Sequence, residues 1–237
     1  MKNLIRFKFT KIDTQTFGNN KLKSKGQNLV FCPFLHNRET MIIFLDTETT
    51  GLRPGKICQL SYVMQSGKNV KEKNFFFSVD FVEYGALKVH GFSVPILRGL
   101  SNGKVFADHV DEIEKDFNEA SLIVAHNTSF DFMFLRAEFE RANRFFNSEK
   151  GFCSMKKTLP ICKILRSNHA GYKYPKLAEL CEFLDISNSQ IQTKTVELFG
   201  NDCGFHDARF DTTALFLAVN KLADKYEDFY FLKELEL

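Results

Sequence analysis

The stretch IIFLDTETTGL, residues 42–52, decides how the rest of this chain is interpreted, because an apolar run ends in two carboxylates. Its first four residues are bulky and uninterrupted by polar side chains, which is typical of a strand buried on both faces of an α/β sheet. Side chains alternate along a strand, so Asp46 and Glu48 point to one face and Thr47 points away from it. Two carboxylates this close repel each other unless one is protonated or a cation lies between them, and hard divalent cations prefer oxygen ligands. The stretch therefore predicts a metal site at a strand end, with a pair of solvated acids as the alternative.

The length and charge distribution predict one catalytic domain with appendages. A chain of 237 residues with 44% hydrophobic residues can build one substantial core. We expect the domain at residues 41–225 and a C-terminal helix end or tail at 226–237. Residues 1–40 hold eight Lys and Arg against two acids, so they carry a net charge of +6 and the remainder carries −3. Whole-chain basicity is therefore only a weak argument that the domain binds nucleic acid.

The first forty residues show no sustained period of 2 or 3.6, so we expect a basic, flexible N-terminal extension. An organelle transit sequence, a nucleic-acid-binding arm, a simple tail and a mis-assigned extension upstream of Met41 are the alternatives. No apolar run has the length of a signal peptide or a membrane span, so no membrane partner is expected. The six cysteines contain no C-x-x-C pair, which indicates reduced thiols in a cytoplasmic protein and argues against structural zinc.

The later segments predict a mixed sheet flanked by helices. Residues 57–65 and 75–81 have strand composition and form an expected antiparallel hairpin around a turn at 66–69. Residues 121–125, SLIVA, predict a second buried strand, and a strand–helix–strand order is typical of a parallel sheet. The remaining periodic segments predict helices at 84–90, 105–117, 157–165 and 177–184, one following residue 125, and a long one from residue 207 onward.

Two further acids lie on these elements. Asp131 is in the first turn of the helix that follows SLIVA, at the C-terminal side of a buried strand and so near the expected place of Asp46. Asp211 belongs to the core-facing stripe of the last helix, with apolar residues three and four positions further on, where an unpaired charge would be costly. Four acids are therefore attached to elements that an α/β fold can bring together.

Three motifs of the chain are similar to those of a known family. FLDTETTG at 44–51, AHNTSFD at 125–131 and HDARFD at 206–211 resemble the motifs of the DnaQ-like, or DEDDh, 3′–5′ exonucleases, which have the ribonuclease H-like fold. KVHGFS at 88–93 is a weaker fourth match. The resemblance spans about residues 42–222 and implies an α/β fold with a mixed sheet, an antiparallel hairpin plus parallel strands, flanked by helices.

The resemblance also implies two divalent metal ions, Mg²⁺ or Mn²⁺, and roles for the acids. Asp46 would bridge the two ions, Glu48 and Asp211 would complete the first site, and Asp131 would support the second mainly through water. His206 would be the general base, since imidazole titrates near neutral pH. The sister subgroup has Tyr four residues before the last acid, where this chain has Asp207, so the histidine subgroup is favoured.

Substrate contacts are implied by the same resemblance. Leu52 and Phe92 would line the nucleotide pocket and wedge against the last bases, or else belong to the core. Asn127 would lie near the terminal nucleotide or act as an ordinary helix cap. Residues 171–176, GYKYPK, alternate tyrosine with lysine and would attract phosphates and stack on unpaired bases, the alternative being a solvated loop. The expected substrate-binding set is Thr49, Leu52, His90, Phe92, Asn127, Phe130, Lys173 and Lys176.

We therefore expect a metal-dependent 3′–5′ exonuclease that acts on single-stranded DNA ends and releases nucleoside 5′-monophosphates, with a place in proofreading or DNA repair. An exoribonuclease that trims RNA 3′ ends is the alternative enzyme, and a non-catalytic DnaQ-like interaction subunit is the alternative from another class. The chain contains no polymerase domain, so a proofreading role would require a DNA polymerase in trans.

Overall fold

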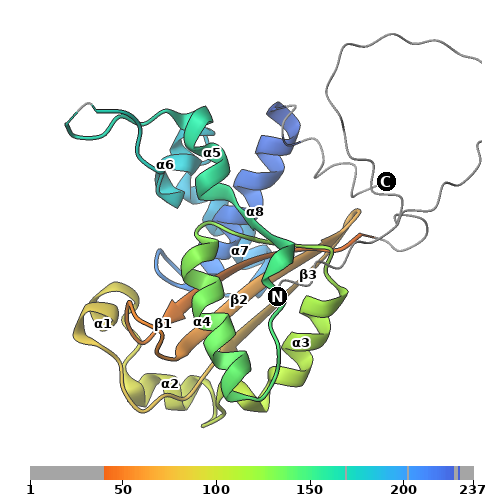
Figure 1. The fold of residues 1–237 in the computed structure, drawn as a ribbon, viewed down its shortest axis with the longest axis vertical. Coiled ribbons are helices and arrows are strands. Elements are labelled where there is room, and N and C mark those ends of the chain that lie inside the picture. Colours follow the sequence, from red (N-terminus) through yellow and green to blue (C-terminus); the bar gives the residue numbers. More distant parts are fainter. Residues whose placement is uncertain (1–39, 169, 202, 227–228, 230–237) are drawn as a thin grey trace, which may run out of the picture. The chain divides into compact units, whose positions relative to one another are not determined.

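The computed structural model describes residues 40–168, 170–201, 203–226 and 229, and these form a mixed α/β unit (Figure 1). The predicted N-terminal extension lies outside the described residues, apart from Thr40, and so does most of the predicted C-terminal tail. The strands are β1 (Ile42–Thr49), β2 (Ile57–Ser66), β3 (Asn69–Phe76), β4 (Leu122–Ala125) and β5 (Gly151–Cys153). The helices are α1 (Tyr84–His90), α2 (Val94–Leu100), α3 (Val110–Glu119), α4 (Thr128–Arg141), α5 (Ser154–Cys162), α6 (Leu177–Phe183), α7 (Asn188–Phe199) and α8 (Ala208–Lys225), with short 3₁₀ helices at Phe106–Asp108 and Ser148–Lys150.

The five strands form one sheet in the order β3-β2-β1-β4-β5. β1, β2 and β3 are antiparallel neighbours, whereas β4 runs parallel to β1 and β5 parallel to β4. β1 and β4 therefore end at the same edge of the sheet, which places the residues that follow them close together. This mixed sheet confirms the predicted fold class.

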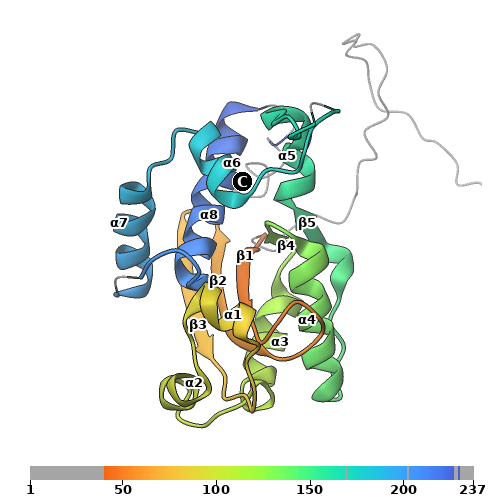
Figure 2. The same cartoon turned by 90° about the vertical axis from the view of Figure 1, so that its left-hand side faces the viewer.

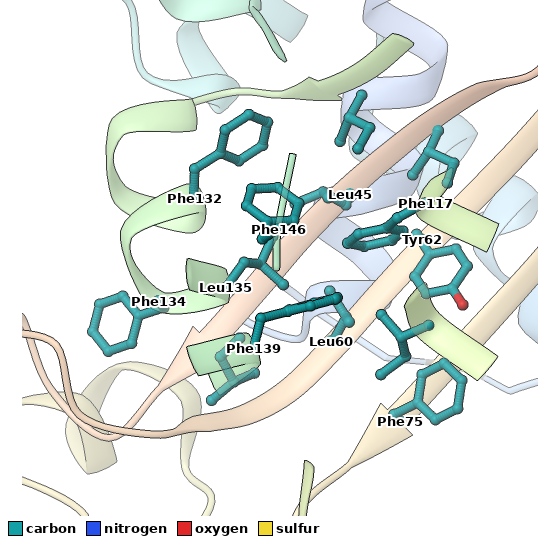
Figure 3. Packing of buried hydrophobic residues seen from close by; sticks show 14 of the residues in the cluster. Leu45, Leu60, Tyr62, Phe75, Phe117, Phe132, Phe134, Leu135, Phe139 and Phe146 are labelled. Carbon is teal, nitrogen blue, oxygen red and sulfur yellow. The ribbon is translucent and has the colours of Figure 1, made fainter. Parts of the chain in front are cut away.

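The two faces of the sheet are covered by different helices. On one face, Ile42 and Phe44 of β1 are buried with Leu215 of α8 and with residues of α6 and α7. On the other face, Ile43 and Leu45 are buried in a cluster that includes many phenylalanines of α3 and α4 (Figure 3). Phe117 and Phe139 stack there with ring centroids 6.2 Å apart. The high phenylalanine content thus fills the core, and it fixes α4 against β1.

Two predicted elements have different boundaries in the structure. The turn of the hairpin consists of Gly67 and Lys68 alone, so β3 starts at Asn69, and the strand predicted at 75–81 was placed too late. β3 is an edge strand whose exposed positions are charged, which hides its alternation in the sequence. The helix predicted at 105–117 is interrupted, because the carboxylate of Asp108 accepts from the backbone N–H of Val105 at 2.8 Å and closes a separate short turn.

Helices α2 and α7 were not predicted. α7 buries only Ile191 and Thr195 and is therefore polar over most of its surface, so its periodicity is weak. Its signal in the sequence is a capping box, since Ser187 Oγ accepts from the backbone N–H of Gln190 and Gln190 Oε1 accepts from the backbone N–H of Ser187. Helix α5 begins at Ser154, three residues before the predicted start.

Candidate active site

The end of β1 distributes its polar side chains between the two faces of the sheet. Strand alternation puts Asp46 and Glu48 on the face covered by α8, together with Ile42 and Phe44. Thr47 lies on the opposite face, which α4 covers. A register shift in the β1–β2 ladder falls between Glu48 and Thr49, directly after the carboxylates. Such irregularities re-aim side chains beside active sites.

Three carboxylates meet at this edge. Oxygen atoms of Asp46, Glu48 and Asp211 all lie within 4.8 Å of one another. Asp211 is in the first turn of α8, whose start is anchored to β2 because Gln59 Nε2 donates to Asp207 at 2.9 Å and Gln59 Oε1 accepts from Ala208 N–H at 3.0 Å. The last helix is thereby held so that its acid faces those of β1.

Asp131 reaches the same edge from the other face of the sheet. It is buried in the first turn of α4, and its carboxylate accepts a hydrogen bond from Thr47 Oγ1 at 2.9 Å. Asp131 is not one of the three acids within 4.8 Å of each other, although it is close enough to raise the pKa values of Asp46 and Glu48. The four predicted acids thus form a group of three and a neighbour attached to Thr47.

The four acids hold their protons more tightly than free carboxylic acids do. Burial, and then repulsion from neighbouring acids, raises the pKa of Asp46 well above its ordinary value and that of Glu48 to about 9. Burial raises the pKa of Asp131 to about 7, although the Thr47 hydrogen bond opposes it. Burial raises that of Asp211 to about 6, against the charge of His206. Charging this group without a cation is therefore unfavourable.

The donor set suits a hard divalent cation. Among the described residues, no ion pair joins any of these four acids to Lys, Arg or His. Asp207, by contrast, is paired with Arg209 at 2.7 Å, and these hydrogen bonds outweigh burial and lower its pKa. Convergent oxygen ligands that lack a basic partner are what Mg²⁺ and Mn²⁺ prefer.

His206 lies next to this group in an unusual backbone conformation. Its φ is +63°, in the left-handed region, and its backbone N–H donates to Asp211 Oδ2 at 3.2 Å. The side chain is exposed, and its charge affects the pKa values of both Asp211 and His90. The predicted base thus lies beside Asp211, and its charge also reaches His90 at the end of α1.

A pocket of about 390 Å³ opens beside Glu48, between the end of β1, the loop that follows it, and α1. Four of the predicted substrate-binding residues line it, namely Thr49, Leu52, His90 and Phe130. Leu52 is 81% exposed, so it covers the mouth of the pocket and is not a core residue. The remaining lining residues are Thr47, Glu48, Gly51, Glu83, Gly85, Ala86 and Val89.

His90 is fixed in one tautomer by its two partners. Its Nδ1 accepts from the backbone N–H of Phe92 at 3.0 Å, so the proton is on Nε2, which donates to the carbonyl of Thr49 at 3.2 Å. Burial lowers the pKa of His90, and this favours the neutral ring. Phe92 is not among the residues that line the pocket. Its ring instead packs edge-on against Phe76, with centroids 5.3 Å apart.

The other predicted substrate contacts lie outside this pocket. Asn127 occupies the N-cap position of α4, as the cap alternative expects, but its side chain makes no capping hydrogen bond. Lys173 forms an ion pair with Glu179 of α6. Lys176 is exposed immediately before α6. Both lysines belong to the loop between α5 and α6.

Sequence reasoning missed the acid of the pocket, Glu83. A Cβ at Gly51 would lie 2.3 Å from the Glu83 carboxyl carbon, so any other residue at position 51 would require the exposed Glu83 side chain to move away from the loop. Glu83 precedes α1 by one residue and reaches the pocket through tertiary packing. The sequence offered one indication of a close contact at this loop, namely Gly51, which directly precedes Leu52, a residue expected in the pocket.

With this geometry in place, the comparisons with known proteins identify the family. A family model described as Exonuclease (RNase_T) matches residues 43–191. The chain belongs to this exonuclease family. The prediction of a DnaQ-like exonuclease is confirmed. The match ends before His206 and Asp211, so the structure alone shows that the last acid of the exonuclease joins the first two.

Curated relatives are DNA polymerase III epsilon subunits. The one from Rickettsia prowazekii is 29% identical over 153 residues, which cover 62% of this chain and 63% of the relative. The one from Salmonella typhimurium is 30% identical over 161 residues, covering 64% and 63%. The chain thus spans somewhat less than two thirds of the length of these relatives.

Solved structures with the same fold include exonuclease I. A product-bound exonuclease I has a TM-score of 0.64 at 16% identity, covering 82% of this chain and 46% of that one. The Escherichia coli enzyme in complex with a dA16 oligonucleotide has a TM-score of 0.64 at 17% identity, covering 81% and 42%. At this identity the likeness shows the fold alone.

Proposed function

We propose that this exonuclease removes nucleotides from the 3′ end of single-stranded DNA in a metal-dependent reaction and releases nucleoside 5′-monophosphates. The observation that supports this proposal is the group of Asp46, Glu48 and Asp211 within 4.8 Å, without a basic partner among the described residues and beside a pocket of nucleoside size. An interaction module would have no use for mutually repelling buried acids.

The acids hold the cations in this proposal. Asp46, Glu48 and Asp211 provide the oxygen ligands of one site, and Asp131, oriented by Thr47, supports a second through water. Two bound Mg²⁺ or Mn²⁺ ions would supply a more acidic attacking water and offset the charge of the phosphate and the leaving oxygen. The raised pKa values imply that the acids release protons as cations bind, so cation affinity increases with pH.

The remaining residues position the substrate and move one proton. Leu52, Val89 and Phe130 offer apolar walls to the terminal base, and base stacking on such walls does not depend on sequence. His90 holds the backbone of Thr49, and with it the pocket side of β1. His206 accepts the proton of the attacking water, for which the neutral ring is required.

Partners and location follow from the same proposal. The relatives are named as polymerase subunits, so we include a DNA polymerase in trans as a proposed partner. No helix among the described residues is long and apolar enough to cross a membrane. A cytoplasmic location stays a prediction based on the cysteine usage.

The test uses a 5′-labelled single strand with Mg²⁺, Mn²⁺ or EDTA, alongside duplex DNA and RNA of the same sequence. We expect stepwise shortening of the DNA strand with a divalent ion, no product in EDTA, and slower reaction when a 3′-phosphate blocks the end. Asp46→Asn should be inactive, and Glu119→Gln, which removes an exposed acid of α3, should be active. Cleavage of circular single-stranded DNA would contradict an exonuclease, and faster cleavage of RNA would favour the exoribonuclease.

A further inference from the structure

The net negative charge of the domain hides one strongly basic segment. Residues 150–178 contain seven Lys and Arg and no acid, although the chain after Thr40 carries a net −3. The segment comprises β5, α5 and the loop that leads to α6. We call residues 154–168 and 170–176, which are α5 and the described part of this loop, the basic ramp. Clustered cations of one sign are the electrostatic footprint expected for a polyanion.

Most charges of this segment face solvent. Two of the seven are only partly exposed: Lys150 donates to carbonyls at the C-terminal end of α3, and Lys173 pairs with Glu179. Two others donate to neutral oxygens, Lys156 to Ser129 Oγ and Arg166 to the carbonyl of Tyr172. The exposed cations are Lys156, Lys157, Lys163, Arg166 and Lys176. None of these five forms an ion pair with an acid of the described residues, so five exposed positive charges lie along one helix and its following loop.

The basic ramp starts at the edge of the sheet that carries the acids. The backbone N–H of Met155 donates to the carbonyl of His126 at 3.0 Å, directly after β4. Lys156 donates to Ser129 Oγ at 3.0 Å, two residues before Asp131. The first turn of α5 is thus next to the first turn of α4, so a strand that leaves the active site can reach the basic ramp without a gap.

His126 holds the far end of the basic ramp to the same place. Its Nε2 lies 2.9 Å from the carbonyl of Pro175, which can only accept, so Nε2 carries the proton. Its Nδ1 then accepts from Ser154 Oγ at 2.9 Å. One half-buried imidazole thereby joins the end of β4, the start of α5 and the loop before α6. The surface is consequently fixed relative to the acids.

The loop of the basic ramp presents aromatic rings between its charges. Leu165 and Tyr172 form an antiparallel bridge, closed by Arg166 N–H to Gly171 O at 3.0 Å and Lys173 N–H to Ile164 O at 2.8 Å. Tyr172 and Tyr174 are 44% and 49% exposed, so each offers a ring face to a base. Figure 1 shows this loop projecting beyond α5 and α6.

The helix that lines the pocket and the helix of the basic ramp lie on opposite sides of β1, the strand that carries Asp46 and Glu48. Figure 2 looks onto this end of the sheet and shows α1, which lines the pocket, below β1, with α5 and α6 above it. We propose that the basic ramp binds the sugar-phosphate backbone of the single strand upstream of the terminal nucleotide, while Tyr172 and Tyr174 stack on its bases. This inference rests on the proposed function, because it assumes that the terminal nucleotide occupies the pocket.

The test compares two triple variants that each remove three positive charges. Lys157→Gln, Lys163→Gln and Arg166→Gln remove exposed charges of the basic ramp, and Lys68→Gln, Lys71→Gln and Lys115→Gln remove exposed charges of the hairpin and α3. Binding of labelled oligothymidylate and oligouridylate is measured in EDTA by fluorescence anisotropy over a range of salt concentrations. The slope of log K against log salt is negative, and each lost phosphate contact on a single strand reduces its magnitude by about 0.7. The magnitude of the slope should therefore fall by about 2 in the ramp variant and stay the same in the control variant.

Binding in EDTA separates this inference from the proposed function. An inactive wild type that binds strands, with a slope reduced only in the ramp variant, would refute the exonuclease proposal and support the basic ramp. An active wild type whose slope is unchanged in the ramp variant, or falls equally in the control, would overturn the basic ramp. A wild type that binds neither oligonucleotide would also overturn it. Equal losses on oligothymidylate and oligouridylate indicate recognition of the shared backbone, and a loss on one alone assigns the surface to DNA or to RNA.

Discussion

Asp131→Asn should stabilise the metal-free protein, and increasingly so at higher pH. The amide keeps an acceptor for Thr47 Oγ1 and removes the buried charge. Burial raises the pKa of Asp131 from 3.8 to about 7, so the folded state holds the proton more tightly than the unfolded state. The wild-type free energy of unfolding therefore falls as pH increases between these values, and the contribution of this acid is constant above them.

The magnitude follows from the size of the shift. Each unit corresponds to about 1.4 kcal/mol, so the advantage of the variant should be roughly 1.5 kcal/mol at pH 5 and about 4 kcal/mol at pH 8. Relief of the repulsion that Asp131 exerts on Asp46 and Glu48 acts in the same direction. Saturating Mg²⁺ should reduce the difference in unfolding free energy between the variant and the wild type, because a cation that binds only the folded state stabilises the wild type.

The assay is urea unfolding at pH 5 and pH 8, in EDTA and in Mg²⁺. Glu119→Gln controls for the loss of one carboxylate elsewhere, since Glu119 is exposed at the end of α3. If the difference in unfolding free energy between variant and wild type were the same at both pH values in EDTA, the raised pKa of Asp131 would be refuted.

Three further predictions concern the metal, the base and the pocket. EDTA should abolish activity and Mg²⁺ or Mn²⁺ should raise the Tm, and Asp46→Asn should lose both effects; full activity in EDTA would rule out metal dependence. His206→Ala should lower single-turnover rates by about 10²–10⁴ with metal-induced thermal shifts retained. An active His206→Ala variant would remove this residue from the mechanism. Because His206 has a positive φ, His206→Gly should be more stable than His206→Ala by on the order of 1 kcal/mol. Asn143 also has a positive φ, so Asn143→Gly should likewise be more stable than Asn143→Ala, and both Asn143 variants should keep full activity. Phe130→Ala should raise KM by roughly fivefold to 150-fold, since a stacked base is worth about 1–3 kcal/mol. Phe145→Ala, which removes an exposed ring outside the pocket, should leave KM unchanged.

Alternation along one strand explains what could be predicted from the sequence. It placed Asp46 and Glu48 on a common face, and the core-facing position of Asp211 then required a partner on that face. The same rule implies that Thr47 meets the helix on the other face, yet its bond to Asp131 was not predicted because the sequence does not show which helix covers which face. Glu83 and Val89 were not predicted either, since α1 reaches the end of β1 only through tertiary packing.

The arrangement of charge implies different roles for cations at the two ends of a bound strand. Without cations the acids at the edge of the sheet offer a phosphate no positive charge, and those that ionise repel it, whereas the basic ramp attracts the backbone whether or not cations are present. We therefore expect Mg²⁺ to be required for seating the terminal nucleotide and for cleavage, and to change the affinity for an upstream strand only through ordinary salt screening. A strand with a cleavage-resistant phosphorothioate end, titrated in EDTA and in Mg²⁺ at matched ionic strength, measures this separation. Seating of the terminal nucleotide in the pocket should require Mg²⁺, while the overall affinity for the strand changes little. Loss of all strand binding in EDTA would contradict these separate roles, because it would mean that the acids and their cations hold the whole strand.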